Sequence, residues 1–175
     1  LIAQGYQRIA FIGGEVELSP GRERRAGYQQ AIIDSGLTVD PALMQLDHFK
    51  IDSGQRLAHQ LLSGPHRPDA VFSASNLLTL GVMKGIREAG LRIPDDLALV
   101  GFDDMPWVSE LYTPLTVVAQ LTYELGQEAV RTLLRRRSAP DAPIHTVTLR
   151  TSLIVRESCG ATRRKEGDGS DTPHG

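Results

Sequence analysis

Hydrophobic and polar positions along this chain predict an alternation of strands and helices. Short apolar runs occupy residues 8–14, 69–74, 97–102 and 115–119, and a weaker one occupies 43–49. Between them, hydrophobic residues recur at helical spacing over 21–36, 52–64, 77–89 and 123–137. Uninterrupted apolar runs are typical of strands that are buried on both faces, as in parallel sheets. We therefore predict a doubly wound, mostly parallel α/β sheet with helices on both faces.

Cap and turn residues predict where these elements begin and end. Gly36 and Gly90 follow two of the helical segments, as helix-ending glycines do. Candidate N-terminal caps precede the helices at 52–64 and 77–89: Asp52 or Ser53, and Ser75 or Asn76. Residues 145–156 alternate and predict one or two more strands, whereas the polar tail over 161–175 is predicted to be disordered.

Composition limits the class of protein. The chain has 175 residues, 41% of them hydrophobic, and a formal net charge of −2. This balance argues against a disordered chain and against a surface that coats nucleic acid. The single cysteine, Cys159, excludes an internal disulfide and indicates a reducing compartment such as the cytoplasm. No apolar run approaches the roughly 20 residues that span a bilayer, so no membrane partner is expected. Residues 1–4 resemble the middle of a helix, so we expect a segment upstream.

The predicted sheet indicates where a ligand would bind. In open parallel α/β sheets, ligands bind beyond the carboxyl ends of the strands. The loops at that edge carry a guanidinium, carboxylates, hydroxyls, amides and two aromatic rings, namely Arg24, Asp47, His48, Phe49, Ser73, Ser75, Asn76, Asp103, Asp104, Trp107 and Gln120. A carboxylate and a guanidinium can each engage two adjacent hydroxyls, and an aromatic ring can stack on a sugar or a purine. This set of groups suits a neutral polyhydroxylated ligand.

Each candidate also has a plainer interpretation. Arg24 in a first helical turn could be solvated, and Asp103 could serve only as a turn residue. Ser75 and Asn76 are also cap candidates. Phe49 could be a rim hydrophobe, and Trp107 could pack between a loop and a helix.

Sequence patterns for catalysis and cofactor binding are missing. There is no P-loop, no nucleophile elbow and no complete dinucleotide fingerprint, and Glu15 would repel a phosphate after Gly13-Gly14. The histidines have no metal-ligand spacing with one another or with Cys159. His48 is the histidine nearest the ligand edge and is interpreted as a rim residue. We therefore expect no catalytic residue, no metal and no cofactor.

The chain resembles the effector-binding part of the LacI/GalR family of bacterial transcriptional repressors. The resemblance covers about residues 1–159 and rests on QGYQRIAFIGG, RERRAGYQQAI, the long run ending in GLRIPDDLALVGFDD, then PLTVVAQ, LGQEAV and LIVRESC. It implies a periplasmic-binding-protein-like fold, in which two α/β lobes surround a ligand cleft. Residues 1–160 would be the C-terminal part of that domain.

The resemblance also assigns segments to the two lobes. Residues 1–120 and about 150–160 would form the second lobe, and residues 121–149 would belong to a first lobe that this chain lacks. The helix-turn-helix headpiece that contacts operator DNA would lie outside the chain as well.

The resemblance assigns ligand contacts residue by residue. Arg24 matches the effector-contacting arginine of the R-x-x-G-[FY] helix start, Asp103 the aspartate of GFDD, and Phe49 a cleft aromatic. Ser75-Asn76 stands where the family commonly has Asn-Asp, which puts the hydroxyl contacts there in doubt. Ser19 lies in a loop that often contacts ligand. Trp107 resembles an aromatic of members with sugar-like effectors.

The resemblance implies a cytoplasmic repressor that binds a small-molecule effector, such as a sugar or sugar derivative, and that forms a homodimer. Effector binding would change lobe closure and thereby affinity for operator DNA. Two alternatives remain open. One is an exported sugar-binding protein of an ABC transporter on the same fold, and the other is an enzyme of flavodoxin-like architecture, for which no nucleophile–base pair or metal set is seen.

Overall fold

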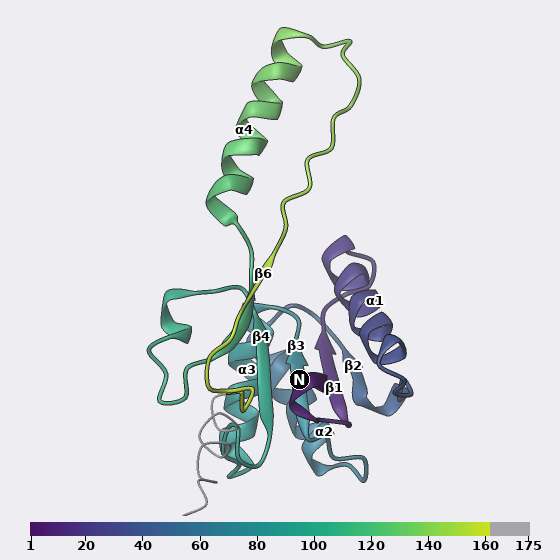
Figure 1. The fold of residues 1–175 in the computed structure, drawn as a ribbon, viewed down its shortest axis with the longest axis vertical. Coiled ribbons are helices and arrows are strands. Elements are labelled where there is room, and N and C mark those ends of the chain that lie inside the picture. The colour runs from purple at the N-terminus through teal and green to yellow at the C-terminus, as the bar shows by residue number, and fades with distance from the viewer. Residues whose placement is uncertain (162–175) are drawn as a thin grey trace, which may run out of the picture.

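A computed structural model describes residues 1–161 and contains, within that range, one six-stranded sheet (Figure 1). Its strands are β1 (Ile9–Gly13), β2 (Met44–Leu46), β3 (Ala70–Ser73), β4 (Ala98–Phe102), β5 (Thr116–Ala119) and β6 (Ser152–Ile154). They lie in the order β2-β1-β3-β4-β5-β6. The first five are parallel and β6 is antiparallel. The predicted mostly parallel sheet is confirmed, while the predicted tail lies, apart from Ala161, outside the described residues.

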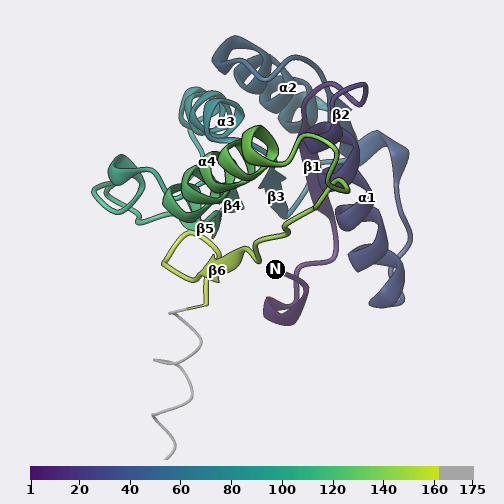
Figure 2. The ribbon, with the colours of Figure 1, turned by 90° about the horizontal axis from the view of Figure 1, so that it is seen from above.

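Helices cover both faces of this sheet, as predicted. The helices are α1 (Ser19–Asp34), α2 (Ile51–Ser63), α3 (Asn76–Glu88) and α4 (Thr122–Ser138), with 3-10 turns η1 (Ile2–Gln4), η2 (Pro41–Leu43) and η3 (Pro106–Val108). Figure 2 shows α2 and α3 on one face, and α1 with the N-terminal segment on the other. Alternate residues of each inner strand therefore point into two different apolar clusters.

The α2 and α3 helices pack with their backbones in contact. A Cβ at Gly54 would lie 2.3 Å from the carbonyl oxygen of Leu78, and one at Gly81 would lie 2.0 Å from that of Ile51. Real Cβ atoms do not come this close to backbone oxygens. The two glycines thus set the separation of the helices, and leucines and valines fill the space between helices and sheet.

One of the two predicted caps is wrong. Helix α2 begins at Ile51 after Lys50 and has no side-chain cap. Ser53 instead hydrogen-bonds the carboxylate of Asp47. Ser75 does cap α3, because its hydroxyl accepts a hydrogen bond from the Leu78 amide at 3.2 Å. A capping side chain near a helix start is therefore informative only when no other polar group competes for it.

Residues 121–151 leave the sheet and return to the same edge. Ala119 at the end of β5 pairs with Ser152 at the start of β6, so both ends of the excursion lie at the carboxyl ends of the parallel strands. Helix α4 contributes no buried residue and projects away from the sheet (Figure 1). The strand pattern predicted from residue 145 forms a strand only at 152–154, because residues 145–151 run beyond the sheet.

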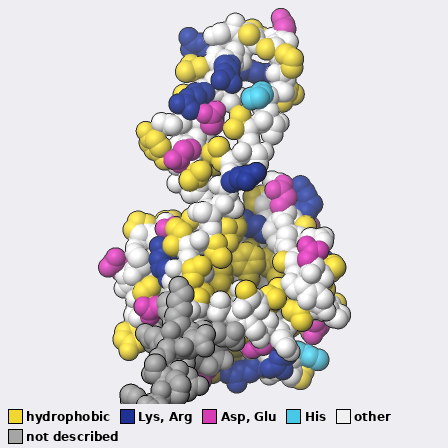
Figure 3. All heavy atoms as spheres, in the orientation of Figure 1, with side chains coloured by type: hydrophobic (Ala, Val, Ile, Leu, Met, Phe, Trp, Pro, Cys, Tyr) yellow, Lys and Arg dark blue, Asp and Glu magenta, His cyan; other side chains and the backbone are white. Residues whose placement is uncertain are grey.

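The α1 face of the sheet is only partly covered by the described residues. Figure 3 shows hydrophobic side chains gathered in a hollow between α1 and β6. The corresponding groove has a volume of about 400 Å³, and its lining includes Phe72, Val100 and Val118 from three adjacent strands. Apolar surface therefore remains on this face as well as on α4.

Candidate functional site

Arg24 joins the carboxyl ends of two neighbouring strands. It lies in the second turn of α1 and is partly buried. Its Nη1 atom donates a 2.6 Å hydrogen bond to the carbonyl oxygen of Ala74, which directly follows β3. Its guanidinium lies 3.6 Å from the ring centroid of Phe102, the last residue of β4, as a cation–π pair. The alternative that Arg24 is simply solvated does not fit this geometry.

Asp103 directly follows β4 and lies at the same edge. Its φ of 74° is in the left-handed region, which aspartate tolerates better than most residues. Its Oδ1 atom accepts a 2.6 Å hydrogen bond from Nε2 of Gln120, and its amide donates to the carbonyl oxygen of Val118. Asp103 therefore does serve as a turn residue, and its carboxylate is also aimed along the carboxyl edge towards the end of β5.

The charges of Arg24 and Asp103 act on each other. Burial lowers the pKa of the Arg24 guanidinium, and the negative charges of Asp103 and Glu23 oppose this shift. Arginine remains protonated throughout the physiological range despite such shifts. A partly buried cation and a carboxylate thus face the same region at neutral pH.

Phe49 occupies the loop after β2 and is partly buried. It packs against the apolar cluster under α2 and α3. Its ring also lies directly over Gly14, since a Cβ on that glycine would come within 2.2 Å of the ring. The ring therefore sits beside the end of β1, at the same edge as Arg24 and Asp103.

Glu15 contacts this loop, although its sequence position did not predict the contact. Glu15 accepts hydrogen bonds from Nδ1 of His48 at 2.7 Å and from the Phe49 amide at 3.2 Å. From the sequence, Glu15 was expected only to repel a phosphate. The partners are more than 30 positions apart, and the available signal was that both loops follow adjacent parallel strands.

The described residues include no group of three or more histidine, cysteine, aspartate or glutamate side chains that could hold a metal ion. The same part of the chain has no helix long and apolar enough to cross a bilayer. The side chains at the carboxyl edge offer hydrogen-bonding groups, charges and aromatic rings.

Comparison with known proteins places this geometry in a family. The sequence profile of the periplasmic binding protein-like domain matches residues 1–159. The chain belongs to this family. The ribose operon repressor of Haemophilus influenzae is 34% identical over 158 residues, which are 90% of this chain and 48% of the repressor. The complex of the transcriptional regulator CelR with cellobiose superposes with a TM-score of 0.86 at 37% identity, covering 90% of this chain and 48% of CelR.

A third comparison extends the same result. The Lac repressor dimer bound to operator and the anti-inducer ONPF gives a TM-score of 0.80 at 30% identity, covering 90% of this chain and 54% of that one. The resemblance to LacI/GalR regulators is confirmed, and the relatives named here are regulators of transcription. The chain spans about half the length of the relatives that it matches.

The remaining predicted contacts are less well placed for a ligand of this periplasmic binding protein-like domain. The Ser75 hydroxyl is buried and caps α3, and Oδ1 of Asn76 accepts a hydrogen bond from the Leu77 amide at 2.6 Å. Ser19 is the exposed first residue of α1 and not a loop residue. Trp107 lies in η3 and packs against the core under α3. Their ligand roles remain predictions.

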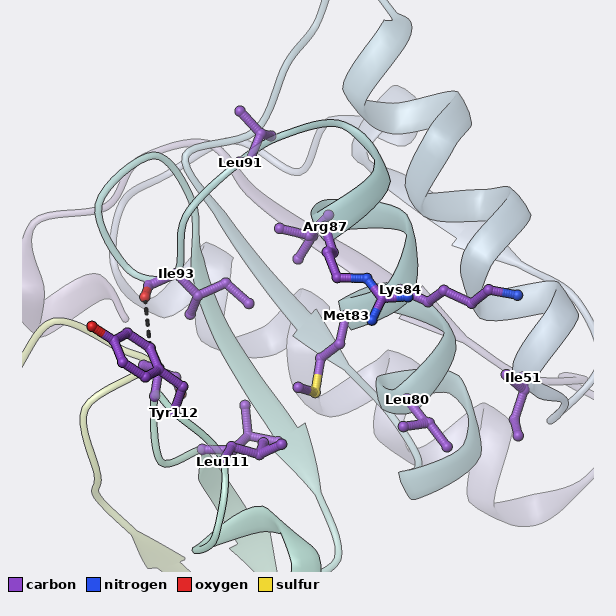
Figure 4. Close-up of a pocket in the computed structure, with 13 residues that line it drawn as sticks. Ile51, Leu80, Met83, Lys84, Arg87, Leu91, Ile93, Leu111 and Tyr112 are labelled. Carbon is purple, nitrogen blue, oxygen red and sulfur yellow. Dashed lines mark hydrogen bonds between the residues drawn. The ribbon is translucent and has the colours of Figure 1, made fainter.

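A second depression of the domain lies beside α3 (Figure 4) and shares no residue with the predicted effector contacts. Its volume is about 640 Å³. Leu80 and Met83 line it from α3, and Leu111 and Tyr112 line it from the loop before β5. Its lining is mostly apolar and also includes Lys84 and Arg87, but it contains no carboxylate and therefore lacks the pairing of opposite charges found at the carboxyl edge.

Proposed function

We propose that this chain is the effector-binding part of a transcriptional repressor and binds a sugar or a related polyhydroxylated molecule at the carboxyl edge of its sheet. The observation that supports this most is the placement of Arg24 and Asp103 at one edge, with the Phe49 ring at the same edge. A guanidinium and a carboxylate bind adjacent hydroxyls, and an aromatic ring stacks on the apolar face of a sugar. A complex of the relative CelR contains cellobiose.

We also propose that residues 121–149 belong to the first lobe of the domain, whereas residues 1–120 and about 150–160 form the second. Helix α4 exposes four large hydrophobic residues, namely Leu125, Val130, Leu133 and Leu134. Residues 121–151 leave the sheet and return to it at the carboxyl edge. A lobe attached there would face Arg24 and Asp103 across a cleft. The relatives are about twice as long as this chain, which leaves room for such a lobe.

In this proposal the effector acts by favouring one arrangement of the two lobes. A ligand that contacts both lobes binds the closed arrangement more tightly than the open one. It stabilises the closed arrangement by the difference between its two binding free energies. A DNA-binding headpiece joined to the lobes would then gain or lose affinity for its operator in the cytoplasm. The relatives are regulators of transcription, which supports this proposal over the alternative of an exported sugar-binding protein of a transporter. An upstream helix-turn-helix would support a repressor, and an upstream secretion signal would contradict it.

A thermal-shift screen tests the binding proposal. The intact protein is heated with pentoses, hexoses, disaccharides, sugar acids and nucleosides. A ligand that binds only the folded state at about 100 times its Kd stabilises it by roughly 2.7 kcal/mol. We expect one chemical class to raise the Tm by several degrees. No shift with any neutral polyhydroxylated compound would contradict the proposal.

We further propose that the depression beside α3 is part of a homodimer interface. Leu80 is 40% exposed and Tyr112 is fully exposed, which is unusual for two large side chains that line one apolar groove. A two-fold interface uses the same patch on both subunits and so suits a self-complementary apolar face. The Lac repressor, with the same fold, forms a dimer.

Replacing Leu80 with aspartate is expected to convert the intact protein from dimer to monomer, because burying a carboxylate in the interface removes its hydration, even with Lys84 one turn away on α3. Light scattering after size-exclusion chromatography measures the mass. Ile33→Asp is the matched control, since Ile33 is 57% exposed on α1 and does not line the groove. An unchanged dimer with Leu80→Asp would place the interface elsewhere.

A further inference from the structure

Glu15 connects two loops at the carboxyl edge. It directly follows the Gly13-Gly14 pair at the end of β1. One carboxylate oxygen accepts from Nδ1 of His48 at 2.7 Å, and the other accepts from the backbone amide of Phe49 at 3.2 Å. The loop after β1 is thereby linked to the loop after β2.

The same connection sets the position of the Phe49 ring. A hydrogen bond to the Phe49 backbone fixes the start of its side chain, and Gly14 leaves the space in which the ring lies. On its other side the loop is attached to α2, because Asp47 bonds Ser53 and pairs with Arg56. The aromatic residue thus stands between two sets of polar contacts.

Glu15 is poorly suited to bind a ligand itself. Both of its oxygens are engaged by protein groups. The hydrogen bond from His48 is the main reason that the pKa of Glu15 lies below its usual range, so the carboxylate remains ionised at neutral pH. The ionised form accepts both hydrogen bonds, and its negative charge strengthens them.

We propose that Glu15 is a positioning residue, which holds Phe49 over Gly14 so that the ring presents a fixed aromatic surface to the effector. The inference rests on the proposed function, because it concerns the same carboxyl-edge site. It adds a residue that makes no ligand contact and acts through Phe49. Preorganisation of this kind raises affinity. A ring that is already fixed in the free protein loses no conformational entropy when the effector binds.

Hydrogen exchange tests the link without any ligand. In the intact protein, the Phe49 amide is expected to exchange about tenfold faster in Glu15→Ala than in the wild type, because it loses its acceptor. Glu15→Gln keeps an acceptor oxygen and is expected to restore part of the protection. Glu17→Ala, an exposed carboxylate in the same loop, is the control and should leave exchange unchanged. Unchanged exchange in Glu15→Ala would overturn the proposal.

Binding of ribose and cellobiose, measured by calorimetry, tests whether the link acts through Phe49. Glu15→Ala and Phe49→Ala are each expected to weaken binding of the accepted sugar about tenfold. The double variant should bind no more weakly than Phe49→Ala alone, since Glu15 has nothing left to position. Additive losses would overturn the positioning role. If the wild type binds neither sugar while the exchange result holds, it is the choice of effector in the proposed function that fails.

Discussion

Replacing Arg24 with alanine is expected to lower the affinity of the intact protein for its effector by roughly ten- to a hundredfold. The guanidinium is partly buried, bonded to Ala74 and stacked on Phe102, so its position is fixed before any ligand arrives. Its loss removes a charge-assisted donor and leaves the Asp103 carboxylate without the nearby cation. Calorimetry with the sugar found in the thermal screen measures the effect.

The companion variant is Asp103→Asn. Asparagine also tolerates the left-handed backbone that this position requires, so the variant removes the charge while keeping the turn. We expect a similar loss of effector affinity and an unchanged affinity for operator DNA in the absence of effector. Arg22→Ala is the control, because Arg22 is an exposed arginine two positions earlier in the same helix. Full effector affinity in both Arg24→Ala and Asp103→Asn would reject the site.

The largest expected change in stability comes from Gly81→Ala. The new methyl group would meet the backbone oxygen of Ile51 at 2.0 Å, and backbone atoms of α2 cannot rotate away as a side chain can. The two helices would have to separate, which loosens the apolar cluster beneath them. We expect the free energy of unfolding to fall by about 3 kcal/mol, at the upper end for overpacked cores. Urea unfolding followed by circular dichroism measures it.

Gly27→Ala provides the matched comparison. This glycine also lies within a helix, but a Cβ there would have no neighbour within 4 Å. Alanine restricts the unfolded chain and favours the helix, so this variant should be more stable than the wild type by roughly 0.4–1 kcal/mol. Similar effects of the two substitutions would show that the contact between α2 and α3 does not depend on Gly81.

The sequence predicted the sheet well because its core strands are buried on both faces. The strands that contain Ile9 and Leu99 have no polar side chain, and the strand that contains Val71 has one, the buried Ser73. Such runs are typical of a parallel sheet with two covered faces. Topology then predicted the candidate site, since the carboxyl ends of parallel strands share an edge. Arg24 and Asp103, 79 positions apart, came to one edge by this rule.

Contacts between loops could not be predicted in the same way. The Glu15–His48 pair depends on the detailed paths of two loops, which no local pattern encodes. The same holds for Ser53, which bonds Asp47 and does not cap α2. The alternating pattern after residue 145 predicted a strand that lacks a neighbour, because pairing depends on what lies beside a segment and not on its own sequence.

A crystal structure of the intact protein with the sugar identified by the thermal screen tests the central claim most directly. The account predicts the sugar at the carboxyl ends of β1, β3 and β4, with the Arg24 guanidinium and the Asp103 carboxylate bonded to its hydroxyls and the Phe49 ring against it. A sugar bound in the depression beside α3, or one that leaves both charged groups without contact, would contradict it.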